Sequence, residues 1–167
     1  MIPGIFLLVL IALDQIVKTI VAGNFREGES LPLLPGFFHI TYVRNRGVAF
    51  GLLQGKGGII SALTGIAVIL ILWYLRQNRK HISGLEKYGF LLIAAGAAGN
   101  LLDRVFRGYV VDMIDFRGIW SYIFNAADVW INVGVGFIIL DYILGLARGK
   151  GKKKNANESN DKTNKTE

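Results

Sequence analysis

The sequence contains no cysteine, which excludes several kinds of chemistry at once. Without thiols the chain has no disulfide bond, no cysteine nucleophile and no cysteine-ligated zinc. Histidine is nearly as scarce, and the two histidines are His39 and His81. The topology inferred below puts them on opposite sides of a membrane, so a zinc protease and a Ser-His-Asp triad are both disfavoured. Ser121 is therefore interpreted as an interfacial hydroxyl.

Long polar stretches are also scarce. Hydrophobic residues make up 52% of the 167-residue chain, its mean hydropathy is +0.42, and the apolar residues fall into four blocks at 2–23, 59–75, 88–102 and 126–146. About 20 apolar residues cross a bilayer as a helix. The first block lacks the basic start of a cleaved signal peptide and contains Asp14 and Lys18, so a retained span is expected. The sequence predicts an all-α integral membrane fold of four transmembrane helices, in one domain at 1–148 without a separate soluble catalytic domain.

Lysine and arginine are concentrated in two short segments and give the chain a net charge of +7. One segment is the connection 76–87, and the other is the tail after Leu146. Basic residues flank membrane helices on the cytoplasmic side, so both segments and both termini are predicted to be cytoplasmic, and nucleic-acid binding is not expected. The tail, 149–167, is basic and then polar without aromatic residues, which predicts a disordered end.

Two outer segments lie between the predicted spans. The first, 24–58, is rich in aromatic and β-branched residues between Phe37 and Phe50, which predicts two or more short strands. A loop of this length without a helix is uncommon unless it binds something, so this loop is expected to form a small extracytoplasmic sheet, or cradle, on the membrane surface. The second segment, 104–124, carries three aromatic residues typical of the membrane interface, Tyr109, Trp120 and Tyr122.

Several polar residues interrupt the apolar spans. Asp14 and Lys18 are four residues apart and share a helix face, where they form either a packing ion pair or a brace for a functional site. Asn100, Asp103 and Arg104 share one face at the outer end of the third span. Arg104 either reaches the membrane surface with Asp103 neutralising it, or both residues belong to a site.

Asp112 and Asp128 precede and begin the last predicted span, so they are expected at one depth. Two carboxylates at the edge of an apolar region do not both ionise easily. A shared proton gives one acid and one base at neutral pH, as hydrolysis by an activated water requires. Asp115 is an equally acceptable partner on spacing alone.

Five motifs in order resemble those of the bacterial lipoprotein signal peptidase family, also called signal peptidase II, along nearly the whole chain up to about Arg148. The motifs are Asp14-Gln15 with Lys18, Asn45-Arg46-Gly47-Val48-Ala49-Phe50, Gly99-Asn100-Leu101-Leu102-Asp103-Arg104, Val110-Val111-Asp112-Met113-Ile114-Asp115-Phe116 and Phe124-Asn125-Ala126-Ala127-Asp128. Each motif is weak alone, whereas five in this order are specific. Val48 departs from the pattern, because the family usually has a small alanine there, and it is expected to reshape the substrate groove without touching the chemistry.

The resemblance implies an aspartic endopeptidase with Asp112 and Asp128 as its catalytic dyad and no cofactor. It implies site-supporting roles for Asp14, Lys18, Asn45, Gly47, Asn100, Asp103, Arg104 and Asn125. The implied substrates are prolipoproteins whose lipobox cysteine carries diacylglycerol, cut just before that cysteine. The enzyme is expected to work as a monomer among membrane lipids, multi-pass in the bacterial cytoplasmic membrane, with its site near the outer face.

Two other functions fit part of the pattern. Asp14, Lys18 and Asp103 fit a small proton-coupled transporter, although four short helices without a visible inverted repeat make a poor alternating-access device. A non-enzymatic envelope scaffold leaves the outer carboxylates unexplained.

Within the dyad, Asn125 is a good N-cap that puts Asp128 in the first turn of a helix, so Asp128 is predicted to be the ionised base and Asp112 to keep the shared proton.

Overall fold

The structure is a computed structural model that describes residues 2–47 and 57–163. Within these ranges four helices are long and apolar enough to cross a membrane: α1 (Ile2–Asn24), α2 (Gly57–Gln77), α3 (Gly84–Arg107) and α4 (Ala126–Thr163). The four predicted spans are confirmed, and their ends lie within a few residues of those expected, except at the end of α4. Val48, where the sequence departs from the family pattern, lies outside the described residues.

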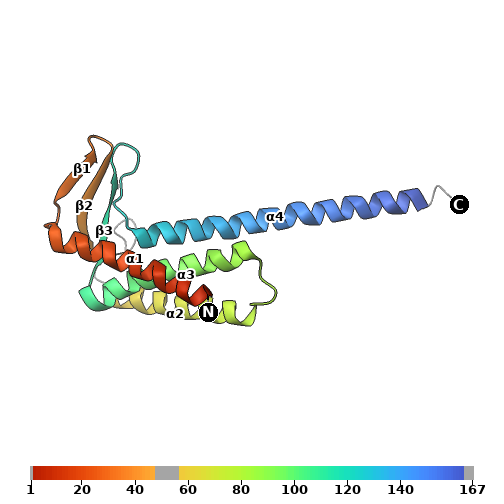
Figure 1. Ribbon diagram of the computed structural model, residues 1–167, viewed down its shortest axis with the longest axis horizontal. Coiled ribbons are helices and arrows are strands. Elements are labelled where there is room, and N and C mark those ends of the chain that lie inside the picture. Colours follow the sequence, from red (N-terminus) through yellow and green to blue (C-terminus); the bar gives the residue numbers. More distant parts are fainter. Residues whose placement is uncertain (1, 48–56, 164–167) are drawn as a thin grey trace.

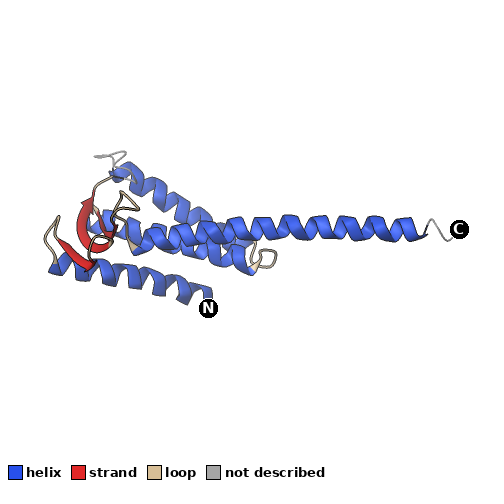
Figure 2. Ribbon diagram, turned by 90° about the horizontal axis from the view of Figure 1, so that it is seen from above, coloured by secondary structure: helices blue, strands red, loops and turns tan. Residues whose placement is uncertain are grey.

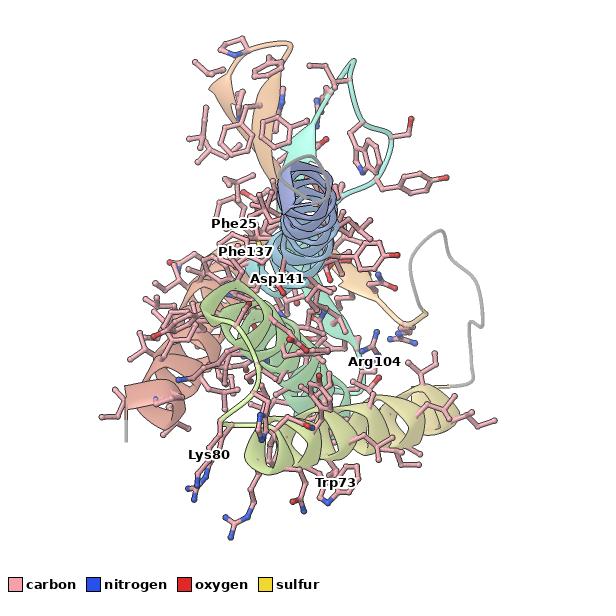
Figure 3. All side chains as sticks on the ribbon, turned by 90° about the vertical axis from the view of Figure 1, so that its right-hand side faces the viewer. Phe25, Trp73, Lys80, Arg104, Phe137 and Asp141 are labelled. Carbon is pink, nitrogen blue, oxygen red and sulfur yellow. The ribbon has the colours of Figure 1, made fainter. Side chains whose placement is uncertain are left out.

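Helix α3 is the centre of the bundle, because it packs against α1, α2 and α4. Figures 1 and 2 show the helices lying lengthwise beside one another, with the strands gathered at one end. Helices α3 and α4 approach closely at glycines, since a Cβ atom on Gly96 would overlap the carbonyl group of Ala127. Among the described residues the outer side of α2 has no protein neighbour, and Trp73 points away from the bundle with 58% of its surface exposed (Figure 3). That side suits contact with lipid.

A three-stranded antiparallel sheet lies beside the bundle end at which α4 begins (Figure 1). Strands β1 (Ser30–Leu34) and β2 (Phe38–Asn45) come from the segment between α1 and α2, as predicted, but β1 lies before the stretch 37–50 in which the strands were expected. The structure adds β3 (Val110–Phe116), which follows α3 and pairs with β2 so that Val43 lies opposite Asp112. A short apolar run that contains aspartates fits both a buried strand and the edge of a membrane span, so hydropathy alone does not identify this strand.

The sheet is fixed to the bundle by an apolar cluster. Val21 near the end of α1 packs with Tyr42 of β2 and with Val111 and Met113 of β3, and all four side chains are buried. Val111 and Met113 are the neighbours of Asp112 in the chain. The strand that carries this aspartate is therefore held rigidly against the first helix.

Helix α4 is longer than predicted. Its membrane-length part ends at Ala147, close to the expected end at Leu146, but its backbone stays helical to Thr163 and projects past the other helices (Figure 1). The disordered tail at 149–167 stays a prediction, and the backbone described at 149–163 is helical. This segment has no proline, but its glycines and asparagines disfavour helix, so its composition does not explain the helical backbone.

Candidate active site

After β3 the chain turns and returns along the same strand. The backbone N–H of Ile114 donates to the carbonyl oxygen of Phe124 (2.7 Å), and the N–H of Phe124 donates back to Ile114 (3.1 Å). This return brings the next residue, Asn125, beside Asp112, where its Nδ2 donates to Oδ1 of the aspartate at 2.6 Å. The loop 117–123 thus separates the two aspartate segments in sequence while the backbone pairing keeps them together in space.

Asn125 is also the N-cap of α4. Its Oδ1 accepts a hydrogen bond from the backbone N–H of Asp128 (3.1 Å), and its own N–H donates to Oδ2 of Asp128 (3.2 Å). This is a reciprocal capping box, and it confirms the prediction that Asp128 lies in the first turn of the helix. A helix N-terminus stabilises a negative charge by about 0.3 to 1 kcal/mol. One amide side chain therefore joins both aspartates.

Asp112 is almost fully buried, with 3% of its surface exposed. Its Oδ2 accepts a hydrogen bond from Nδ2 of Asn45 (2.9 Å), and the amide oxygen of Asn45 accepts from the N–H of Gly47 (3.0 Å), which fixes the amide's orientation. Burial raises the pKa of Asp112 from 3.8 to about 6; hydrogen bonds from Asn45 and Asn125 oppose this rise, and the nearby charge of Asp128 adds to it. Asp112 therefore keeps a proton at a higher pH than an ordinary aspartate.

Asp128 is held by a second bridging amide. Asn100 donates from Nδ2 to Oδ1 of Asp128 (2.8 Å), and its amide oxygen accepts from Nζ of Lys18 (2.8 Å). Every carboxylate oxygen of Asp112 and Asp128 thus accepts a hydrogen bond from an amide N–H. Fixed donors on every oxygen orient the two carboxylates before a substrate binds.

A buried ionic cluster lies behind the aspartates. Nζ of Lys18 is 2.9 Å from Oδ2 of Asp14 and 3.0 Å from Oδ2 of Asp103, and all three side chains are fully buried. Gln15 donates to Asp14 (3.2 Å), and Arg107 pairs with Asp103. Each charge at this depth has a partner of opposite sign, which a charge inside a membrane requires.

The ionic cluster also holds the backbone of both aspartate segments. Oδ1 of Asp14 accepts from the N–H of Ala127 (3.0 Å), and Oδ2 of Asp103 accepts from the N–H of Val111 (3.1 Å). Ala127 and Val111 directly precede Asp128 and Asp112 in the chain. The geometry therefore fits the brace proposed for the Asp14–Lys18 pair, in addition to an ion pair.

One interpretation of the sequence paired Arg104 with Asp103, but in the structure these two side chains form no ion pair. It extends from α3 toward the end of β2 (Figure 3), where NH2 donates to the carbonyl oxygen of Gly47 (3.2 Å) and NH1 to that of Asn100 (3.3 Å). Asp103 is paired with Lys18 and also with Arg107, a partner that was not predicted from the sequence although it lies four residues further on the same helix face. Arg104 thus joins the loop after β2 to the end of α3.

Asp115, the alternative partner for Asp112, forms hydrogen bonds at the sheet instead. Its Oδ2 accepts hydrogen bonds from Oγ1 of Thr41 (2.7 Å) and Nε of Arg117 (3.1 Å). Burial raises the pKa of Asp115, but the bonds from Thr41 and Arg117 outweigh it, so the pKa lies below 3.8. An aspartate that stays ionised and is held by two donors is suited to joining strands.

A cavity of about 1140 Å³ opens beside the two aspartates. Asp112 and Asp128 lie on its wall. The apolar part of the lining includes Phe116, Trp120, Phe124 and Ile131, and the basic part includes Arg44, Arg46 and Arg104. Two carboxylates with one raised pKa, facing such a cavity, can activate a water and protonate a carbonyl oxygen. Across the described ranges no three His, Cys, Asp or Glu side chains converge as metal ligands would.

Comparisons with known proteins agree with this arrangement. A family model described as signal peptidase (SPase) II matches residues 6–144. A lipoprotein signal peptidase of Fusobacterium nucleatum subsp. nucleatum is 57% identical over 136 residues, which cover 81% of this chain and 82% of that protein. One of Clostridioides difficile is 44% identical over 140 residues, covering 84% and 93%.

The fold has a solved counterpart as well. A structure described as a bacterial membrane enzyme superposes with a TM-score of 0.81 at 31% identity, covering 87% of this chain and 90% of that one. The four helices, the sheet and the family match together confirm the resemblance seen in the five sequence motifs. The chain belongs to the signal peptidase II family of aspartic peptidases and is a multi-pass bacterial membrane protein.

Proposed function

We propose that this chain removes signal peptides from diacylglyceryl-modified prolipoproteins by cutting just before the lipobox cysteine, with Asp112 and Asp128 as the catalytic dyad. The observation that carries the proposal is the Asn125 side chain, which binds both aspartates on the wall of one cavity. The relatives at 57% and 44% identity are lipoprotein signal peptidases, which supports this substrate class.

In the proposed reaction Asp128 is the base and Asp112 the acid. Asp128 removes a proton from a water molecule as the water oxygen attacks the scissile carbonyl carbon. Asp112 gives its proton to the carbonyl oxygen, which forms a tetrahedral gem-diol. As the C–N bond breaks, Asp128 passes the proton it took from water to the leaving amine, and a hydroxyl of the gem-diol returns a proton to Asp112. The raised pKa of Asp112 and the capped helix N-terminus at Asp128 support this division.

Other residues of the five motifs position the proposed dyad. Asn45, with Gly47, and Asn125 orient Asp112; Asn100 orients Asp128; and Asp14, Lys18 and Asp103 hold the backbone before each aspartate. Arg104 is assigned a similar role, because it fixes the carbonyl of Gly47 beside Asn45. None of these residues needs to touch the substrate to affect the rate.

The proposed orientation has both termini in the cytoplasm and the sheet outside, in a protein that acts as a monomer surrounded by membrane lipids. The basic connection between α2 and α3, which carries Lys80, lies at the end of the bundle away from the strands (Figures 1 and 2). Basic connections lie on the cytoplasmic side. Prolipoproteins expose their modified cysteine at the outer leaflet, so the dyad has to lie at the sheet end.

Cleavage of a defined substrate tests the proposal. The purified full chain in a lipid bilayer nanodisc is expected to release a signal peptide from a diacylglyceryl-modified prolipoprotein, and much more slowly from the same protein without the lipid. Chelators and serine- or thiol-directed reagents should not change the rate. A chain that leaves the lipidated substrate intact but conducts protons into liposomes would favour the transporter instead.

A further inference from the structure

Asn132 is a polar side chain on the membrane-spanning part of α4 that the proposed dyad does not use. It is exposed, and it lines the same cavity as Asp112 and Asp128. The span from Ala126 to Ala147 is otherwise mostly apolar. Besides Asp128, the acidic residue of this span is Asp141, whose Oδ1 accepts a hydrogen bond from Ser83 of the α2–α3 connection (2.6 Å).

The amide of Asn132 is only partly satisfied. Its Nδ2 donates to the carbonyl oxygen of Asp128 in the preceding turn (2.8 Å). Within the described ranges the amide oxygen and the second N–H have no hydrogen-bond partner. An asparagine side chain can donate two hydrogen bonds and accept two, so one donor and one acceptor face the cavity.

An unpaired amide is unfavourable at membrane depth, because lipid provides no hydrogen-bond partner. The neighbouring residues Ile131 and Val133 are apolar, as expected for a span. A polar residue inside a span that faces a cavity commonly contacts what passes through that cavity. The unused donor and acceptor of Asn132 are therefore suited to a ligand that carries both kinds of group.

The depth of Asn132 identifies the part of the substrate beside it. Asn132 is four residues after Asp128, which puts it about 6 Å further into the membrane along α4. An extended peptide advances about 3.3 Å per residue, so this distance corresponds to about two residues from the scissile bond. In a signal peptide whose mature part is outside, the residues before the cysteine are the ones deeper in the membrane.

We infer that Asn132 binds the substrate backbone at the second or third residue before the cleavage site, its amide oxygen accepting from a peptide N–H and its free N–H donating to a peptide carbonyl. This inference rests on the proposed function. A peptide must leave its helix to present the scissile bond to the dyad, and the backbone groups freed at that depth need partners within the protein. A side-chain amide supplies both partners at once.

The first test replaces the amide. Asn132→Leu is expected to lower kcat/KM for a lipidated prolipoprotein roughly five- to twentyfold, as loss of hydrogen bonds to a desolvated backbone does. Val133→Leu is the matched control, because Val133 is exposed on the same turn but does not line the cavity. It is expected to cleave at the normal rate. Equal thermal unfolding of both variants in nanodiscs shows that the loss is not misfolding.

The second test locates the contact. In a series of lipidated substrates, each carries one ester in place of one backbone amide at the four residues before the cysteine, so that one N–H is removed at a time. The ester at the second or third position is expected to slow the unmodified enzyme, and to have no further effect on Asn132→Leu. If every ester lowers kcat/KM by the same factor in both enzymes, Asn132 acts only through the Asp128 backbone and the inference is wrong. If the unmodified enzyme cleaves none of the substrates, the proposed function fails instead.

Discussion

At the scale of single residues, the hydrogen bonds to the carboxylates of Asp112 and Asp128 come from amide groups. Asn45, Asn100 and Asn125 each use the amide oxygen for one contact and the amide nitrogen for another, which leaves little freedom for any of them to rotate. Neutral donors orient a carboxylate without forcing it to ionise as strongly as a cation would. This arrangement fits the proposed role of Asp112 as the proton donor of the pair.

The raised pKa of Asp112 predicts how the rate depends on pH. The acid is active only while protonated, a condition met below its pKa of about 6 and lost as the pH rises through that value. The measured kcat/KM is expected to fall about tenfold per pH unit above this point, with the apparent value belonging to the coupled pair. A kcat/KM that instead rises through pH 6 would make Asp112 the base and reverse the assignment.

Asn125 offers a second prediction at this scale. The hydrogen bond from Asn125 lowers the pKa of Asp112, so Asn125→Ala is expected to move the descending limb of the pH profile to higher pH. The rate at the optimum should drop on the order of ten- to a hundredfold, because both aspartates lose their common anchor. Asn24→Ala is a suitable control, since in the described part of the chain the Asn24 side chain bonds only to Ile20 of its own helix. A descending limb that stays at the same pH would show that Asn125 does not contact the acid.

Part of this site could be predicted from the sequence. Capping of α4 by Asn125 is a local property, and it could be read from an asparagine placed three residues before Asp128. The bond from the same amide to Asp112 depends on the chain turning back along β3, which involves partners distant in sequence. For the same reason the use of Asp115 in the sheet could not be recognised, because Thr41 belongs to another strand.

At the scale of secondary-structure elements, the dyad depends on how closely α3 and α4 approach. Gly96 of α3 lies against Ala127, directly before Asp128, whereas Gly136 of α4 has open space around the position of a Cβ atom. The sequence does not distinguish these two glycines, since both occur in apolar spans. Their difference comes from which helix face meets a neighbour.

This difference gives a matched pair of substitutions. Gly96→Ala places a methyl group onto the Ala127 carbonyl, so the first turn of α4 must shift, and the cleavage rate is expected to fall by about a hundredfold. Gly136→Ala should cleave normally. Rates are measured on a lipidated prolipoprotein with both variants at equal concentration in nanodiscs. Normal cleavage by Gly96→Ala would show that the dyad tolerates movement between these helices.

Strand β3 could not be predicted from the sequence pattern, whereas the membrane spans could. The spans were predictable because a membrane helix needs one long apolar run, a property of consecutive residues. Strand β3 needs β2 beside it, and β2 is separated from it by α2 and α3. Its apolar residues therefore fit either a span edge or a buried strand until the tertiary structure is known.

At the scale of the whole molecule, the account requires one orientation in the membrane. A reporter fused after Lys154 is expected in the cytoplasm, and one inserted near Glu29 is expected outside, because the basic connection at 76–87 and the basic tail favour the inner side. Access of a membrane-impermeant label to a cysteine introduced at each position measures this directly. Labelling at Lys154 from outside intact cells would put the dyad on the wrong side for exported lipoproteins.

The central claim is that two aspartates carry out the hydrolysis, and the most direct measurement is the single-turnover cleavage rate of Asp112→Asn and Asp128→Asn on a lipidated prolipoprotein. An amide can neither take a proton from water nor supply one as a carboxylic acid does, so each variant is expected to lose at least about a thousandfold in rate while inserting normally in the membrane. Asp115→Asn, the matched acidic control on the same strand, should lose far less because Asp115 is bonded within the sheet. Near-normal cleavage by either dyad variant would contradict the account.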